Sequence, residues 1–402
     1  MKKIRLAAAT ALLFSGLATA PVMAAEEKAE DFTTRTYNAI EINSEVLSSS
    51  QLFRYSSGLT FEYPDAVRGI FVTGHSAGGA RFDSLIDLVN TTDLNAMVID
   101  IKEDFGYLTY EPEEGSELAE FGIGQPYIKD PRAMLERLEQ EEIYPIARVV
   151  VFKDSALAES KPEWSFKEGG QVWKNRRGEA FVNPFMKEVW DYNVDIAIEA
   201  AKLGFKEIQF DYVRFPEGFE NRADTLEYSK GEYDGDDYDN VQRRVDAVTD
   251  FVAYAHEQLE PYDVEVSVDI FGYSATLPEA PGIGQNFSKI SENVDVISSM
   301  IYPSHWTSYF GIAKPDLEPY KLVAEYAKVE NAKLGELEDP PVSRPWLQDF
   351  TASYLGAGNY LNYGKAEVEA QIKALNDNGI DEFLLWNAGN TYSPGVDYTP
   401  NN

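Results

Sequence analysis

Two aspartates, Asp211 and Asp269, occupy comparable places in two apolar segments, residues 207–216 and 264–273. Apolar and polar residues alternate in both segments, which is typical of a strand with one polar face. Two carboxyl groups at one site can cleave a glycosidic bond, because one acid donates a proton to the leaving oxygen while the other carboxylate attacks the sugar or activates water. The sequence therefore predicts a paired-carboxylate hydrolase with Asp211 as nucleophile or base and Asp269 as general acid.

Eight apolar segments have the length and residue types of strands, and a stretch with helical periodicity separates most of them. The strand candidates are residues 67–73, 95–102, 144–152, 207–214, 264–271, 295–302, 344–350 and 382–387. The helix candidates are residues 80–90, 131–141, 186–203, 240–259, 318–330 and 365–378. Strands that alternate with helices imply right-handed parallel crossovers. The pattern predicts an α/β fold, a (β/α)8 TIM barrel with extended loops, and an open doubly wound sheet is the alternative.

In such a barrel the carboxyl ends of all strands meet at one mouth, where catalytic residues lie. We expect nine residues near the strand ends to bind substrate there, namely Asp100, Lys102, Arg148, Arg214, Tyr302, His305, Gln348, Asp349 and Trp386. Asp100, Glu103 and Asp349 are the reserve carboxylates if the predicted acid points away. Alternatively, either member of the catalytic pair only caps a loop or pairs with Arg148 or Arg214.

Two long insertions follow the third and fourth strand candidates, at residues 153–184 and 215–239. Flat aromatic rings on such loops and at strand ends could stack on sugar rings, as large side chains with an apolar face. The candidates are Trp164, Trp173, Trp306 and Trp386. Each of these tryptophans could instead fill a gap between the barrel and its helices.

Residues 74–78 read Gly-His-Ser-Ala-Gly and match the G-x-S-x-G nucleophile elbow of serine hydrolases. Asp269 and His305 follow in the chain order that such a triad uses, so a serine esterase is an alternative. An elbow is preceded by several strands, however, whereas only a polar leader precedes residue 74. Two further strand and helix units also follow His305. We therefore expect Ser76 to be dispensable.

The chain divides into four parts by composition. Residues 1–24 combine three basic residues, an apolar run and a small-residue cleavage site, which predicts a signal peptide and a secreted or otherwise extracytoplasmic protein. A membrane-anchored N-terminus is the alternative. After residue 24, no segment has enough consecutive apolar residues to form a transmembrane helix. Residues 25–64 form a polar N-terminal leader, residues 65–392 the barrel and residues 393–402 a C-terminal tail.

Charge and residue usage exclude several kinds of partner. The chain has 35 Lys and Arg residues against 68 Asp and Glu residues, a net charge of −33, which disfavours nucleic acid and anionic membrane and leaves neutral or cationic polymers. It has no cysteine and only three histidines, so thiolate or histidine metal sites are not expected. The acidic loop 232–239 lacks the spacing of an EF-hand, and we read it as a solvated loop. The sequence predicts no cofactor and no metal, and it does not predict an oligomeric state.

Four phrases of the barrel segment support a more specific interpretation. They are Val67-Arg-Gly-Ile-Phe-Val-Thr-Gly74, Val98-Ile-Asp-Ile-Lys102, Phe210-Asp-Tyr-Val-Arg-Phe-Pro216 and Pro345-Trp-Leu-Gln-Asp349. With them, about residues 65–392 resemble a family of bacterial exported proteins described as glycosyl hydrolases. The resemblance implies a barrel fold and glycoside hydrolysis.

A remoter similarity is to the α-amylase clan, whose barrels carry an Asp nucleophile after strand 4, an acid after strand 5 and a third carboxylate after strand 7. Asp211, Asp269 and Asp349 fall at the corresponding strand ends. The sequence departs from the clan in two places, since the clan has Glu where this chain has Asp269 and Arg where it has Gln209. We expect a secreted glycoside hydrolase that acts on a poly- or oligosaccharide, of cell wall or biofilm for example. A non-catalytic carbohydrate-binding barrel is the alternative.

Overall fold

The computed structural model describes residues 54–235 and 239–400. The predicted signal peptide, most of the polar leader and residues 236–238 of the acidic loop lie outside the described residues. Residues from Tyr55 onward form one compact unit.

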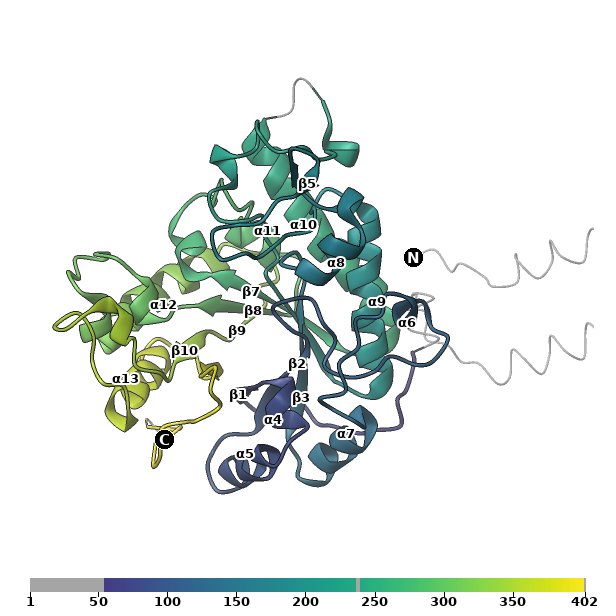
Figure 1. Cartoon of the computed structure of the whole chain (residues 1–402). Helices are drawn as coiled ribbons and strands as arrows, with labels where there is room; N and C mark the ends of the chain where they lie inside the picture. The colour runs from purple at the N-terminus through teal and green to yellow at the C-terminus, as the bar shows by residue number, and fades with distance from the viewer. Residues whose placement is uncertain (1–53, 236–238, 401–402) are drawn as a thin grey trace, which may run out of the picture. The chain divides into compact units, whose positions relative to one another are not determined.

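Eight parallel strands form a closed barrel at the centre of this unit (Figure 1). They are β1 (Arg68–Val72), β2 (Ala96–Lys102), β3 (Tyr144–Val150), β6 (Glu207–Asp211), β7 (Glu265–Phe271), β8 (Val296–Met300), β10 (Trp346–Gln348) and β11 (Phe383–Trp386). The short β9 (Val342–Ser343) pairs with β8 just before β10 begins. Pairing of Trp346 with Met300 joins β10 to β8, and β11 pairs with β1, so that the sheet has no free edge. The predicted (β/α)8 barrel is confirmed.

Helices surround the barrel and connect its strands (Figure 1). The long ones are α5 (Arg81–Asn90), α7 (Pro131–Gln140), α9 (Lys187–Leu203), α10 (Asn240–Leu259), α12 (Pro319–Leu334) and α13 (Lys365–Asn376). Shorter ones are α4 (Gly74–Ala77), α6 (Glu117–Glu120), α8 (Ser155–Ser160) and α11 (Phe287–Ser291). The insertion 153–184 contains α8 and a small hairpin of β4 (Lys167–Glu168) and β5 (Gln171–Val172).

Local sequence signals fix the ends of several helices. Asp130 caps α7 by accepting a hydrogen bond from the backbone N–H of Ala133, and Pro131 occupies the first turn. At the end of α9, Gly204 has a φ of 124°, which a residue with a side chain adopts only with strain. The turn at Gly204 returns the chain to the barrel, where β6 begins at Glu207.

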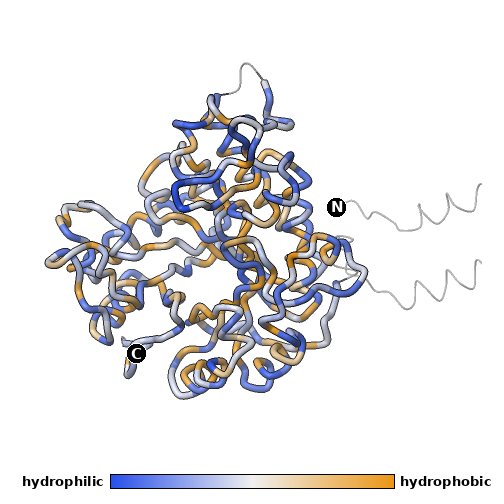
Figure 2. Tube along the Cα trace, viewed as in Figure 1, coloured by the Kyte–Doolittle hydropathy of each residue, from blue (hydrophilic) through white to orange (hydrophobic). Residues whose placement is uncertain are grey.

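The barrel interior changes in polarity along its axis. Hydropathy drawn on the backbone shows apolar residues concentrated along the strands and on the inner sides of the helices (Figure 2). Ala96, Val98, Ile146 and Leu384 belong to a fully buried apolar cluster on the inner face. Alternation along the strands also turns polar side chains inward toward both ends, and buried polar groups need hydrogen-bond partners.

A buried ionic network closes the N-terminal end of the barrel. Arg344 donates to both carboxylate oxygens of Glu207, at 2.7 and 2.8 Å, and to Glu382 at 2.7 Å. Its remaining amino group donates to the hydroxyl of Tyr63 at 2.6 Å, and Ser267 donates to Glu207. In barrels of this kind the N-terminal end contributes to stability rather than to catalysis.

Both ends of the described chain pack onto the barrel. Residues 55–64, the last part of the predicted leader, lie along it, with Leu59 buried and Tyr63 joined to the network of Arg344. In the predicted C-terminal tail, Tyr398 is buried and Ser393 is hydrogen-bonded to a barrel carboxylate. Across residues 54–235 and 239–400, no helix combines the length and the apolar composition that crossing a membrane requires.

Candidate active site

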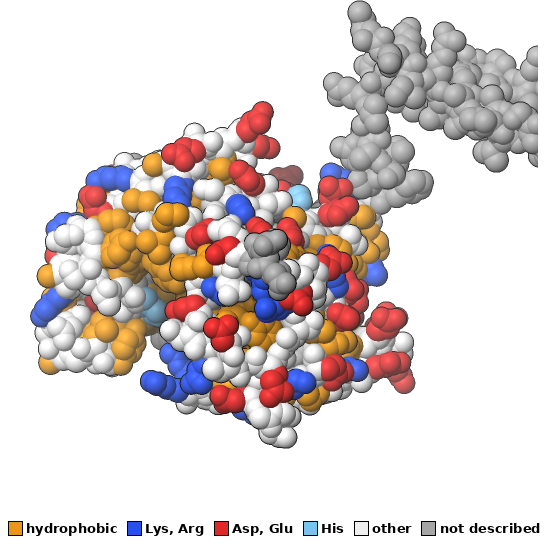
Figure 3. Space-filling view, turned by 90° about the horizontal axis from the view of Figure 1, so that it is seen from above, with side chains coloured by type: hydrophobic (Ala, Val, Ile, Leu, Met, Phe, Trp, Pro, Cys, Tyr) orange, Lys and Arg blue, Asp and Glu red, His pale blue; other side chains and the backbone are white. Residues whose placement is uncertain are grey.

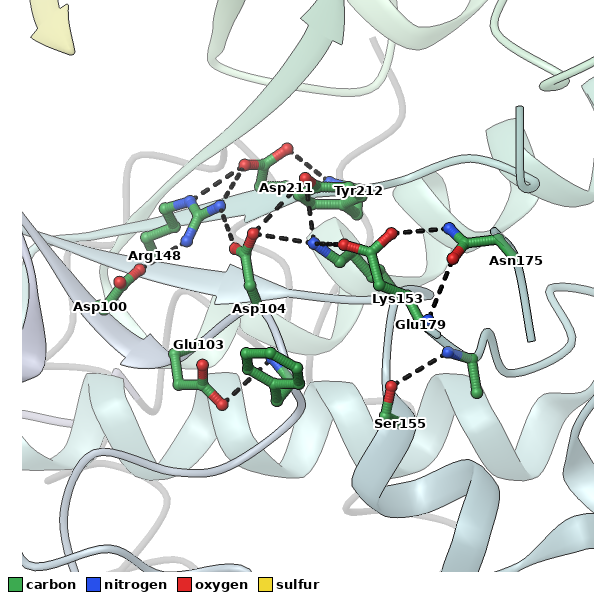
Figure 4. Close-up of polar contacts among 12 residues, drawn as sticks. Asp100, Glu103, Asp104, Arg148, Lys153, Ser155, Asn175, Glu179, Asp211 and Tyr212 are labelled. Atoms are coloured by element: carbon green, nitrogen blue, oxygen red, sulfur yellow. Dashed lines mark hydrogen bonds and ion pairs between the residues drawn. The ribbon is translucent and has the colours of Figure 1, made fainter. Parts of the chain in front are cut away.

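Arg148, at the C-terminal part of β3, organises the mouth of the barrel (Figure 4). Its Nε and Nη2 donate to Oδ2 of Asp211 at 3.0 and 2.7 Å. Its Nη1 donates to Asp100 at 2.6 Å, and Nη2 also contacts Asp104 at 3.0 Å. The guanidinium group is buried, so these charge-assisted hydrogen bonds are stronger than they would be on the surface. One cation thus holds three carboxyl groups from the ends of β2 and β6.

Asp211 is fixed through both of its carboxylate oxygens. Oδ2 accepts from Arg148, and Oδ1 accepts from the backbone N–H of Tyr212 at 2.6 Å. Tyr212 has a φ of 54°, in the left-handed region that residues with a side chain rarely adopt. Such a backbone outlier persists where surrounding contacts enforce it, which is common at functional sites.

Asp269 lies on the neighbouring strand and faces the same interior. The register pairs Phe210 with Val268, so Asp211 and Asp269 are the next residues on strands about 4.8 Å apart. Burial, together with the negative charge of Asp211, raises the pKa of the Asp269 carboxyl well above its ordinary value. A hydrogen bond from Nε1 of Trp346 to Oδ1 of Asp269, at 2.7 Å, works in the opposite direction. The arrangement favours a protonated Asp269 beside a carboxylate held by a cation.

Two further carboxyl groups of the site titrate differently from each other. Burial raises the pKa of Asp100 to about 7, although Arg148 works against it. Burial also favours the neutral form of Asp104, but Arg148 and Lys153 outweigh it and lower the pKa of Asp104 to about 2. The side chain of Asp104 is 41% exposed, which weakens its ion pairs by solvent screening.

Lys153, the first residue of the insertion 153–184, links Asp104 to Glu179 farther along the insertion. Its Nζ contacts Oδ2 of Asp104 at 2.9 Å and Oε1 of Glu179 at 3.0 Å, and it lies 4.6 Å from the centre of the Tyr212 ring. Glu179 also accepts a hydrogen bond from Asn175 at 2.6 Å (Figure 4). A chain of ionic contacts therefore runs from Asp211 through Arg148, Asp104 and Lys153 to the insertion.

Aromatic side chains form the opposite wall of the site. Trp386, at the end of β11, stacks on Phe71 with ring centres 4.1 Å apart. The carbon of the Arg148 guanidinium lies 5.4 Å from the Trp386 ring and 5.6 Å from the Phe71 ring. Tyr302 is buried beside them, and the charges of Asp269 and Asp211 add to burial in raising its pKa. A flat ring beside the carboxylates is the surface against which a sugar ring could lie.

The structure brings together most of the residues that the sequence placed at the mouth. Asp100, Arg148, Asp211, Asp269, Tyr302 and Trp386 surround one interior space through the contacts described above. Arg214 and His305 lie farther out. Arg214 packs over the rings of Tyr212 and Phe271 and pairs with Glu217, and His305 is exposed beside Tyr302.

Lys102 is the clearest departure from its predicted place. A register shift between Asp100 and Lys102 interrupts the alternation of β2 and turns the lysine outward. Lys102 is fully buried between the barrel and α9, where it pairs with Asp154 at 2.6 Å and donates to Asn193 at 2.9 Å. It therefore does not reach the mouth.

Three other predicted residues hold loops in place. Gln348 accepts from the backbone of Ser304 and donates to Asp316, both at 3.0 Å. Asp349 accepts hydrogen bonds from the backbone and the hydroxyl of Ser393, at 2.9 and 2.5 Å. Glu103, a reserve carboxylate, accepts from the backbone of the loop that follows β2.

Of the four predicted tryptophan platforms, Trp386 is the one that contacts Arg148, the cation that binds the carboxylates. Trp164 and Trp173 are half-buried against the hydrophobic core, and Trp306 packs against Tyr309 and Phe310. Their position on loops did not distinguish between these outcomes.

The G-x-S-x-G segment is not assembled as a triad. Ser76 lies in α4, and its hydroxyl accepts from Thr73 at 3.2 Å. His305 contacts Ser304, and Asp269 contacts Trp346. Among the described residues, Ser76 forms no hydrogen bond with a histidine or an aspartate.

Sequence reasoning missed Asp104, Lys153 and Trp346 as parts of the site. Asp104 and Lys153 directly follow predicted strand ends, which is a usable signal, whereas Trp346 gave none because it lies inside an apolar strand. Within the part of the chain that the structure describes, no group of three or more histidines and carboxylates is placed to hold a metal ion.

Comparisons with known proteins identify the family and the fold. A family model described as "Putative glycosyl hydrolase domain" matches residues 69–392. A search of curated proteins finds no match.

Two of the solved structures that match have a similar fold. The glycoside hydrolase domain of PgaB (BpsB) from Bordetella bronchiseptica is 15% identical, with 80% of this chain and 94% of that chain covered and a TM-score of 0.57. An α-amylase from Lactobacillus plantarum is 15% identical, with 80% and 71% covered and a TM-score of 0.50. A hypothetical protein from Ruminiclostridium thermocellum is 33% identical over 50% of this chain and 96% of its own, with a TM-score of 0.43.

Proposed function

Because the chain belongs to the family described as "Putative glycosyl hydrolase domain", which spans residues 69–392, we propose that it hydrolyses a poly- or oligosaccharide with Asp211 and Asp269. The family supports a glycoside hydrolase-type function and a carbohydrate substrate. The pairing of the two aspartates, the substrate and the cellular location are our proposals.

One observation carries the assignment of roles. Asp211 and Asp269 are neighbours on adjacent strands, yet their surroundings differ. Arg148 and the backbone of Tyr212 donate to Asp211, which suits a carboxylate. Burial and the charge of Asp211 keep the proton on Asp269 to a higher pH. Two carboxyl groups whose surroundings separate their protonation are the arrangement that glycoside hydrolysis requires.

The reaction follows from these roles. Asp269 donates its proton to the oxygen of the leaving sugar as the glycosidic bond breaks. The hydrogen bond from Trp346 occupies Oδ1 of Asp269, so Oδ2 is the atom that carries the proton. Asp211 either bonds to the anomeric carbon or takes a proton from the attacking water, while Arg148 balances its charge.

Export is proposed from the N-terminal sequence. Residues 1–24 have the composition of a signal peptide, and a glycan of cell wall or biofilm is then within reach. The acidic net charge of −33 is compatible with a neutral or cationic polymer and incompatible with a strongly anionic one.

The test is a glycan-degradation screen of the protein without residues 1–24, followed by Asp211→Asn and Asp269→Asn. Each variant keeps the shape of the side chain and should lose hydrolysis by roughly 10²- to 10⁴-fold, the usual contribution of an acid or base. Glu330→Gln is the matched control, because Glu330 is a buried carboxyl on α12 that is hydrogen-bonded to Ser343 and is not among the predicted site residues. Full activity of either catalytic variant would remove that residue from the mechanism, and proton NMR of the released anomer would distinguish retention from inversion.

A non-catalytic carbohydrate-binding barrel is the second candidate. It is favoured by the low exposure of the pair, 4% for Asp211 and 2% for Asp269, since a buried ionic cluster also stabilises a barrel. Sugar binding without hydrolysis by the native protein, across the whole panel, would establish this alternative.

A further inference from the structure

Aromatic rings continue from the candidate active site to the surface in one direction. Trp386 and Tyr302 have ring centres 6.4 Å apart, Tyr302 and Phe350 6.1 Å, and Tyr302 and His305 5.3 Å. His305 follows Ser304, whose hydroxyl accepts from the hydroxyl of Tyr354 at 3.2 Å. This series of rings, which we call the aromatic path, passes over the loops that follow β8 and β10.

Tyr354 ends the aromatic path and is unusually exposed for an aromatic residue. Its relative exposure of 68% is the largest among the exposed large hydrophobic residues of the described chain. Leaving such a ring in water forgoes the free energy that burying it would give. Its hydroxyl donates a hydrogen bond to Ser304, which favours one orientation of the ring. An exposed ring with a favoured orientation is suited to receive the flat face of a ligand.

The loop that carries Tyr354 is itself braced. Gly358 accepts from Nζ of Lys314 at 2.8 Å, and the backbone of Leu361 donates to Asp316 at 3.0 Å. Asp316 also accepts from Gln348 at the end of β10. The loop that carries Tyr354 is thereby linked to β10, whose Gln348 pairs with Trp386 of β11.

The two sides of the mouth differ in chemistry. Charged side chains joined in ion pairs occupy the side of β2, β3 and β6, where Lys153 binds both Asp104 and Glu179. The other side is aromatic and offers faces rather than charges. Seen from above, apolar side chains gather on the part of the surface that lies on the side of α12 and α13 (Figure 3).

We propose that the aromatic path is an additional sugar-binding subsite, in which Tyr354 stacks on a sugar ring of a glycan chain that extends from the carboxylates past Tyr302. This inference rests on the proposed function, because it assigns the direction in which the substrate leaves the site. Tyr354 then contributes to the affinity for long chains and not to bond cleavage.

Tyr354→Ala, Tyr354→Phe and a matched surface tyrosine test this subsite. Tyr320 is the control, since it is 41% exposed on α12 and also has its hydroxyl bonded, to Asp377. The probes are oligosaccharides of N-acetylglucosamine, glucose and xylose, each as dimer and hexamer, with binding measured by calorimetry and hydrolysis by released reducing ends.

Tyr354→Ala should weaken binding of the hexamer, or raise its KM, by about tenfold, the contribution of one ring contact. The dimer and kcat should change little, Tyr354→Phe should retain most of the affinity, and Tyr320→Ala should match the native protein. The subsite is overturned if Tyr354→Ala and Tyr320→Ala bind the hexamer equally well. It is also overturned if Tyr354→Ala loses as much affinity for the dimer as for the hexamer. In either case, hydrolysis by the native protein would still support the proposed function. Neither binding nor hydrolysis of any probe by the native protein would overturn both.

Discussion

Nε1 of Trp346 donates a hydrogen bond of 2.7 Å to Oδ1 of Asp269 across the interior of the barrel. The two residues come from β10 and β7, which are separated by β8, so the contact is made through the interior and not along a strand pair. Both side chains are buried. The indole therefore determines which oxygen of Asp269 is left to carry the proton.

Trp346→Phe should move the basic limb of the pH profile of kcat/KM to higher pH. The indole hydrogen bond stabilises the ionised form of Asp269, so its removal raises the pKa of that carboxyl further. The variant should also lose about 1–3 kcal/mol of stability, because a buried acceptor is left without its donor. Trp386→Phe is the control, since Trp386 contacts Arg148 by its ring face. Trp386→Phe should leave the basic limb of the pH profile in place. A shift of that limb to lower pH in Trp346→Phe would contradict the proposed role of Asp269.

Asp100 and Asp104 should affect stability in two separate pH ranges. The pKa of Asp100 rises from 3.8 to about 7 on folding, so its folded form holds a proton more tightly and the free energy of unfolding falls as pH increases between these values. The pKa of Asp104 falls to about 2, so its contribution is present above pH 3.8 and is lost as pH falls toward 2.

Thermal unfolding of Asp100→Asn and Asp104→Asn from pH 2 to 8 measures how each carboxyl group changes the pH dependence of stability. Asp100→Asn should gain stability relative to the native protein as pH rises from about 4 to 7, and Asp104→Asn should flatten the decline below about 4. The second effect should be small, about 1 kcal/mol or less, because Asp104 is partly exposed. Parallel curves for both variants and the native protein would contradict the assignment.

Lys153→Met should reduce hydrolysis more than a comparable change elsewhere on the same insertion. Lys153 is nearly buried and joins Asp104 to Glu179, so its loss leaves Asp104 with Arg148 as its cation and separates the site from Glu179. A displacement of about 1 Å at a catalytic group can cost up to about 10²-fold in rate. Lys174→Met breaks the exposed pair with Glu159 and should change stability by no more than about 0.5 kcal/mol. Similar kinetics for both variants would show that the Lys153 contacts are only structural.

Arg344→Met should destabilise the fold by about 3–5 kcal/mol, because Glu207 and Glu382 would remain buried without their cation. Urea unfolding measures this loss. Arg137→Met is the control, since Arg137 pairs with Asp83 at the surface and should change stability by about 0.5 kcal/mol or less. Equal losses would indicate that the network at the N-terminal end contributes little.

Much of the fold could be predicted because each strand is an apolar run with its own turn signals. All eight predicted strand segments contain a barrel strand, and the differences are confined to their ends. The resemblance to a family of glycosyl hydrolases is also confirmed by the family match over residues 69–392. Local pattern suffices for these features because strand formation and helix capping depend on neighbouring residues.

The site was less predictable because it depends on contacts between distant residues. Position near a strand end was enough to predict Asp100 and Arg148 at the mouth, but Lys102 follows a register shift that no residue type indicates. The indole of Trp346 looked like ordinary core, and its bond to Asp269 appears only when β10 and β7 face each other across the barrel. Whether Asp211 and Asp269 act as proposed remains a prediction.

The contact between Tyr63 and Arg344 bears on where an expressed fragment should start. Composition puts the boundary of the barrel after residue 64, yet the hydroxyl of Tyr63 accepts from the buried guanidinium of Arg344, and Leu59 packs against Gly204. A fragment trimmed at residue 65 would leave Arg344 one acceptor short and uncover apolar surface. The compact unit that contains these contacts begins at Tyr55, ten residues before the point that composition suggests.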